Sequence, residues 1–207
     1  MARVVAGAII ALLLGACSSV EVPEDRFFRL SVTPQAAPSV SPVLTTLVVE
    51  RFEVEGITAQ RPIVHSERGA PFELRQHVYA FWADSPSRLF QDVTIDAVRA
   101  AGIAERVVTP ALRQSAEFRL AGRVRQLEHV RGEPSAARVA VEFSLSRASD
   151  GEVLLLDRSS REVTVEERGV GPVVLAMNGA LDDIYGHLVE RLAGLEGKLA
   201  EAVSRRP

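Results

Sequence analysis

The sequence predicts an α/β fold: a single compact domain in which a mixed, mostly antiparallel β-sheet has two main helices packed on it. Three patterns in the 207 residues lead to this prediction. Apolar and polar side chains alternate over much of 116–165, as they do in half-buried strands. Apolar residues recur at spacings of three and four in 86–100 and again in 174–199, which places them on one face of a helix.

The first residues predict a bacterial lipoprotein signal peptide ahead of that domain. Arg3 precedes an apolar run over 4–14, and the run ends in Leu14-Gly15-Ala16-Cys17. As a helix this run would measure about 16 Å, too short for a bilayer core of about 30 Å. We expect cleavage between Ala16 and Cys17 and acylation of the Cys17 thiol, for instance with palmitate. An ordinary secretory signal with an incidental cysteine is the alternative.

The residues after the cysteine indicate the membrane and the reach of the anchor. Ser18 and Ser19 stand where an Asp would often signal inner-membrane retention, so we expect the outer membrane and its periplasmic face. The nine residues 18–26 read as a tether and span at most about 30 Å. The predicted organisation is therefore a signal peptide (1–16), an acylated cysteine and tether (17–26), a folded domain (27–193) and a C-terminal helical extension (194–207).

The first half of the domain predicts short strands and one helix. We expect a strand over 27–32, a proline-rich loop after it, and a strand within 44–54. Segments 63–65 and 73–82 read as paired strands around a Gly-Ala-Pro turn. Ser85-Pro86 predicts a helix start with a serine cap, and Gly102 predicts its end before a short strand over 103–108.

The second half predicts a three-stranded meander followed by a helix. The meander covers 116–165, and Asp150-Gly151 is a strong hairpin turn within it. The final helix begins after Gly171-Pro172, and its apolar stripe indicates packing on the sheet. Since glycine weakens helices, we expect a break near Gly194, and the extension beyond it could contact a partner.

Composition favours neither a nucleic-acid nor a metal-binding protein. The formal net charge is −3, whereas nucleic acids favour a basic surface. Cys17 is the only cysteine, so the mature domain has no disulfide and no thiolate metal site.

The sequence contains no motif for catalysis or for a cofactor. It lacks the serine-nucleophile elbow, the Walker loop and the dinucleotide fingerprint. His65, His77, His129 and His187 are scattered without ligand spacing, and we expect each at the surface or in a capping role. The pair Asp182-Asp183 is expected to be solvated near the positive end of the last helix. We therefore expect no enzyme, no catalytic residue, no metal and no cofactor.

The junction between the second strand pair and the first helix is the one unusual constellation. Trp82, the only tryptophan, stands there with Asp84 and Pro86. These residues are candidates either for core packing across the corner or for contact with a partner.

Several of these segments together resemble a known family. They are Tyr79-x-x-Trp82-Ala83-Asp84-x-Pro86, Phe118-Arg119-Leu120-x-Gly122, Asp150-Gly151-Glu152 and Ala176-Met177-Asn178-Gly179-Ala180-Leu181, in this order behind the lipoprotein signal. The chain resembles the ABC-type transport auxiliary lipoproteins, relatives of paraquat-inducible protein C. The resemblance implies a compact α/β sandwich of a mixed sheet with helices packed on it.

The resemblance also implies a function and a partner. Such a lipoprotein would be a non-enzymatic outer-membrane accessory of a system that moves phospholipids between membranes and supports membrane integrity. It would dock the mammalian-cell-entry domain protein of an ABC transporter. From the presumed tubular shape of that partner, copies of this chain could form a ring around it as a homo-oligomer. The alternative is a stand-alone periplasmic lipid-binding chaperone. Activation of a peptidoglycan-building enzyme ranks last, because the tether is too short to cross the periplasm.

Overall fold

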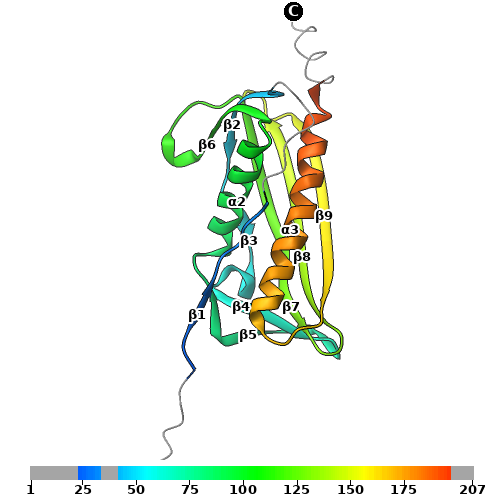
Figure 1. Ribbon diagram of the computed structural model, residues 1–207. Helices are drawn as coiled ribbons and strands as arrows, with labels where there is room; N and C mark the ends of the chain where they lie inside the picture. Colours follow the sequence, from blue (N-terminus) through cyan, green and yellow to red (C-terminus); the bar gives the residue numbers. More distant parts are fainter. Residues whose placement is uncertain (1–22, 34–41, 197–207) are drawn as a thin grey trace, which may run out of the picture.

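The computed structural model describes residues 23–33 and 42–196, and these form one curled sheet with two helices on it (Figure 1). The predicted signal peptide, Cys17, most of the proline-rich loop and most of the C-terminal extension lie outside the described residues.

The first half of the domain supplies the outer strands and one helix. Short strands and single turns come first, and the helix follows the longest strand of this half. The elements are β1 (Arg26–Phe28), β2 (Leu44–Val49), β3 (Glu53–Val54), the 3-10 turn η1 (Gly56–Ala59), β4 (Pro62–Glu67), β5 (Ala70–Trp82), α2 (Pro86–Ala100), β6 (Ala104–Val108) and the 3-10 turn η2 (Pro110–Leu112).

The second half is the predicted meander followed by the long helix. Its elements are β7 (Phe118–Arg131), β8 (Ser135–Arg147), β9 (Val153–Val165) and α3 (Val170–Ala193). Helix α3 ends where glycine was expected to end it, with Gly194 at the cap. It begins slightly before the predicted start, at Val170.

The sheet is mixed, as predicted. Within the described residues it has nine strands, with the order β1-β5-β4-β7-β2-β6, and β8 and β9 continue from β7. The two longest ladders, β7–β8 and β8–β9, are antiparallel. β1, β2, β3 and β4 make short parallel ladders that local sequence patterns do not reveal.

Both helices lie on one face of the sheet and enclose the core (Figure 1). The predicted stripe of α3 is buried: Met177, Leu181, Ile184 and Leu188 are each fully inaccessible to solvent. Among the described residues, no helix combines the length and apolar character needed to span a bilayer.

The predicted strand within 44–54 is interrupted, so β2 and β3 are separate elements. Phe52 lies in this interruption and turns its ring into the core, where it contacts the rings of Phe90 and Phe143 at centroid distances of 5.7 and 6.0 Å. The ring occupies the space over Gly122, where a Cβ atom would lie only 2.1 Å from it. Gly122 is therefore required by the close approach of Phe52 to the sheet.

Candidate functional site

The residues at the strand-to-helix junction belong to the fold. Trp82 is only 1% exposed, and its carbonyl accepts a hydrogen bond from Arg61 Nε at 3.1 Å. Pro86 is buried in the first turn of α2. This burial favours core packing over partner contact for both residues.

Asp84 performs part of the role predicted for Ser85. Ser85 occupies the cap position of α2, but its side chain makes no capping hydrogen bond. Instead, Asp84 Oδ1 accepts a hydrogen bond from the backbone N–H of Ser85 at 2.7 Å. Asp84 also lies 3.5 Å from the guanidinium of Arg88, so it organises the start of the helix.

Three histidines that are scattered in the sequence meet at one end of the sheet. His65 (β4) and His129 (β7) are register partners in a parallel ladder. The His77 ring (β5) lies 4.7 Å from that of His65 and 5.4 Å from that of His129, measured between centroids. The expectation of isolated surface or capping histidines is therefore wrong for these three, because strand pairing joins positions far apart in the chain.

A chain of hydrogen bonds connects this cluster to a serine. The Nε2 atom of His77 lies 3.2 Å from Nδ1 of His129, whose Nε2 atom lies 2.9 Å from Ser135 Oγ. His65 Nδ1 is buried without a hydrogen-bond partner, and its nearest carboxylate oxygen, on Glu67, is 3.8 Å away.

Burial makes all three imidazoles weak bases. Loss of water contact, together with nearby His65 and Arg131, lowers the pKa of His77 and His129 from 6.5 to about 4. Burial, followed by the positive charge of Arg131, also lowers the pKa of His65. The cluster is therefore uncharged near neutral pH.

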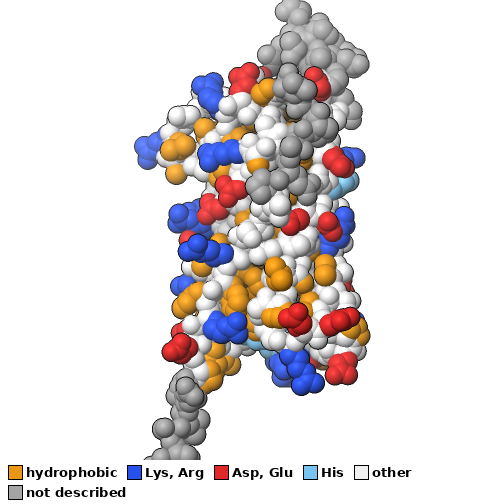
Figure 2. Space-filling model, in the orientation of Figure 1, with side chains coloured by type: hydrophobic (Ala, Val, Ile, Leu, Met, Phe, Trp, Pro, Cys, Tyr) orange, Lys and Arg blue, Asp and Glu red, His pale blue; other side chains and the backbone are white. Residues whose placement is uncertain are grey.

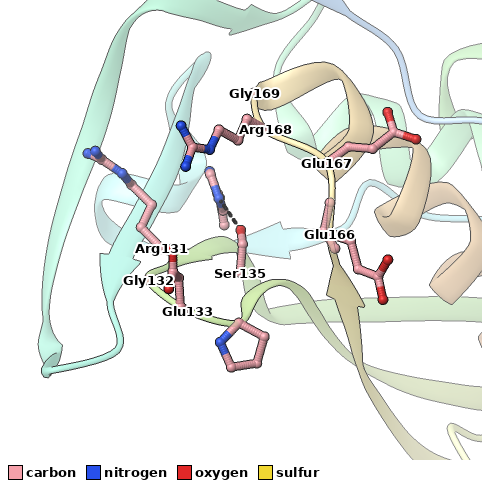
Figure 3. Close-up of a pocket in the computed structure, with 11 residues that line it drawn as sticks. Arg131, Gly132, Glu133, Ser135, Glu166, Glu167, Arg168 and Gly169 are labelled. Atoms are coloured by element: carbon pink, nitrogen blue, oxygen red, sulfur yellow. Dashed lines mark hydrogen bonds between the residues drawn. The ribbon is translucent and has the colours of Figure 1, made fainter.

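The cluster borders an open pocket of about 630 Å³ (Figure 3). His129 and Ser135 form part of its wall, together with the loop before α3. Figure 3 shows Arg131 and Arg168 on one side and Glu166 and Glu167 on the other. Seven of the eleven residues that line the pocket have charged or polar side chains.

The order serine, histidine, histidine is that of a nucleophile, a base and an orienting group. An imidazole with a pKa of about 4 accepts a proton poorly at neutral pH, which argues against catalysis by Ser135. In the described part of the chain, no group of His, Asp or Glu has the arrangement needed to hold a metal ion.

The aspartate pair also departs from its predicted role. Asp182 and Asp183 lie past the middle of α3, away from its positive end. The carboxylate of Asp182 accepts hydrogen bonds from the backbone N–H of Thr33 at 2.5 Å and from its hydroxyl at 3.0 Å. This carboxylate fixes the segment after β1 to the helix.

Comparison with known proteins identifies the family. The model of the ABC-type transport auxiliary lipoprotein component family matches residues 28–188. The chain belongs to this family. It is accordingly a lipoprotein component associated with ABC-type transport, as the sequence resemblance implied, and its family indicates a membrane-anchored protein of the cell envelope.

Solved structures confirm the fold. Protein XCC0632 from Xanthomonas campestris matches with a TM-score of 0.72 at 20% identity, over 86% of this chain and 99% of that chain. An uncharacterized protein matches with a TM-score of 0.64 at 12% identity, over 82% and 99% of the two chains. No curated protein matches the chain.

Proposed function

We propose that this lipoprotein is a non-enzymatic accessory subunit of an intermembrane lipid transport system that contains an ABC transporter and a mammalian-cell-entry domain protein. Acyl chains on Cys17 hold it at the periplasmic face of the outer membrane. There it docks the periplasmic component and supports membrane integrity. The observation on which this rests is the family match over residues 28–188. The lipoprotein signal predicted over 1–16, directly before Cys17, supports it.

The anchor restricts where docking takes place. The tether from Cys17 to Arg26 reaches at most about 30 Å, so the folded domain stays beside its membrane. A partner that comes from the inner membrane must therefore extend to this domain. This requirement favours an elongated periplasmic partner such as the mammalian-cell-entry component.

The described residues give less support to a stand-alone lipid-binding chaperone. A site for acyl chains would need a mainly apolar cavity. The pocket beside His129 is instead lined by arginine and glutamate side chains, and the residues under the helices are closely packed core. We therefore retain the accessory subunit as the proposed function.

Crosslinking in cells tests the docking. An epitope-tagged full-length chain, crosslinked in the envelope and purified under denaturing conditions, should recover the mammalian-cell-entry domain protein. A deletion strain should show greater sensitivity to membrane stress. Recovery of only unrelated envelope proteins, with no transport component among them, would contradict the proposal.

Two substitutions test the anchor separately. Cys17→Ser should release the protein from the membrane fraction or leave it unprocessed, because the acylated thiol is lost. Ser18→Asp should leave acylation intact and move the protein to the inner membrane. Outer-membrane fractionation of an acylated Ser18→Asp protein would show that these residues do not sort it.

A further inference from the structure

Large apolar side chains are exposed along strands β1 and β5. Phe72 is 100% exposed and Val78 is 71% exposed. A single exposed apolar residue is common on protein surfaces and needs no explanation. What distinguishes this group is its concentration on neighbouring strands. Its members, with their exposed fractions, are Phe27 (58%), Phe72 (100%), Leu74 (43%), Val78 (71%) and Tyr79 (40%). We call these five residues the β5 apolar surface.

The strand that bears most of this surface is an open sheet edge. β1 pairs with β5 only through Ala80, Phe81 and Trp82. Among the described residues, the segment 70–79 has a strand neighbour on the β4 side alone. An open edge with apolar side chains favours aggregation unless charges, prolines or a covering surface protect it. The exposed edge of β5 therefore needs an occupant.

The direction of β1 relative to β5 indicates the membrane as that occupant. β1 and β5 are parallel, with Arg26 beside Ala80. The direction back along the chain from Arg26 is therefore the direction from Ala80 back toward Phe72. Figure 1 shows β1, β4 and β5 at the lower end of the molecule, while α3 ends at the upper end.

The lengths agree with this direction. Cys17 lies nine residues before Arg26, which is a reach of at most about 30 Å. Phe72 lies eight residues before Ala80, or at most about 26 Å along the strand. A membrane that holds acylated Cys17 can therefore be no farther from β1 than about the length of the exposed segment.

Arginines accompany the aromatic residues at this end. The guanidinium of Arg26 lies 5.1 Å from the ring centre of Phe28, and that of Arg61 lies 5.4 Å from that of Phe27. Aromatic rings with adjacent cationic groups suit the headgroup layer, where rings enter the apolar boundary and cations meet phosphates. Figure 2 shows hydrophobic side chains, arginines and acidic side chains interspersed over the lower half of the molecule.

We propose that the β5 apolar surface lies in the headgroup layer of the bilayer that anchors Cys17, with Phe72 inserted most deeply. The occupant is a phospholipid membrane. This inference rests on the proposed acyl anchoring and adds a second, protein-mediated contact that fixes the orientation of the domain. The lower end faces the bilayer, and the opposite end is presented to the periplasm.

A fluorescent label at position 72 tests the insertion. Because acylation consumes the thiol of Cys17, the sole native cysteine, Phe72→Cys supplies the only free thiol in the mature lipoprotein. The acylated protein is labelled with the environment-sensitive dye NBD and reconstituted into vesicles of phosphatidylethanolamine and phosphatidylglycerol. We expect a blue-shifted emission and an increase in intensity of about twofold or more, since the dye leaves water.

Leu112→Cys is the matched control. Leu112 is 58% exposed and lies in η2, which precedes the first residue of β7. The β4–β5 turn lies at the other end of β7, where Glu67 pairs with Arg131, about 40 Å away along the strand. The label at 112 should therefore keep the spectrum of the protein in water. Val78→Cys, a second position in the surface, should give a smaller blue shift than Phe72→Cys.

Flotation of the same vesicles distinguishes a failure of the insertion at position 72 from a failure of the acyl anchor. Protein that floats while labels at 72 and 112 respond alike would overturn the insertion and leave the anchor intact. Protein that does not float with the vesicles would overturn both the insertion and the acyl anchoring. A blue shift at 72 that needs no vesicles and grows with protein concentration would show that a second copy covers the edge. Fluorescence of buried Trp82 confirms that each variant is folded.

Discussion

Acidification should destabilise the protein before its carboxylates protonate, because of the histidine cluster. His77 and His129 have pKa values of about 4 in the folded chain, whereas an unfolded chain restores values near 6.5. Between these values the unfolded state binds more protons than the folded state. The contribution of these histidines to the free energy of unfolding is therefore fully present above pH 6.5. It falls progressively as the pH is lowered toward 4.

The size of the effect follows from the same pKa values. At about pH 5, one histidine with this shift loses about 2 kcal/mol of its contribution to stability. The two rings contact each other and share neighbours, and His77 keeps some water contact, so the pair should lose less than twice that amount. We expect a total decrease of about 2 to 4 kcal/mol between about pH 7.5 and about pH 5.

Urea unfolding followed by Trp82 fluorescence measures this decrease, since Trp82 is the sole tryptophan and is buried. The double variant His77→Gln, His129→Gln should lose most of the pH dependence, because glutamine does not titrate. His187→Gln, which removes a histidine outside the cluster, should retain it. Equal stability of the unmodified protein at both pH values, or an undiminished decrease in the double variant, would refute the reasoning.

Three further substitutions test the packing of the domain. Gly122→Ala places a Cβ atom 2.1 Å from the ring of Phe52 and should cost about 3 kcal/mol by urea unfolding, whereas Gly179→Ala, with open space around its Cβ, should stabilise α3 by up to about 1 kcal/mol. Similar unfolding midpoints for these two variants would contradict the packing described. Tyr185→Phe removes the buried 2.7 Å hydrogen bond to Thr94 and should lower the thermal midpoint by a few degrees, about 1 kcal/mol, while an unchanged midpoint would show that this bond adds nothing.

Local patterns in the sequence were sufficient for the elements whose periodicity is long. The meander from β7 to β9 and the helices α2 and α3 were predicted with small shifts at their ends, because each has one face against the core over many residues. The interruption at Phe52 was not predicted, since a ring that turns into the core looks like any other residue of an apolar strand.

The candidate site lacked any such local signal. His65, His77 and His129 lie on three strands, and only the parallel register of β4 with β7 and the pairing of β4 with β5 bring them together. Asp182 similarly meets Thr33 across 149 positions of the chain. No spacing rule along one strand or helix could have found these contacts.

The sequence by itself determined the alternation of strands, the two helices and the expected acylation at Cys17, because each depends on residues close together in the chain. It also determined the family resemblance, because that depends on several short segments and their order. Tertiary structure decided which distant residues share an environment. It buried Trp82, gathered three histidines in a poorly solvated cluster, and left the edge of β5 exposed. Those outcomes depend on strand order and on the water that packing excludes, and neither is encoded in the pattern of any single segment.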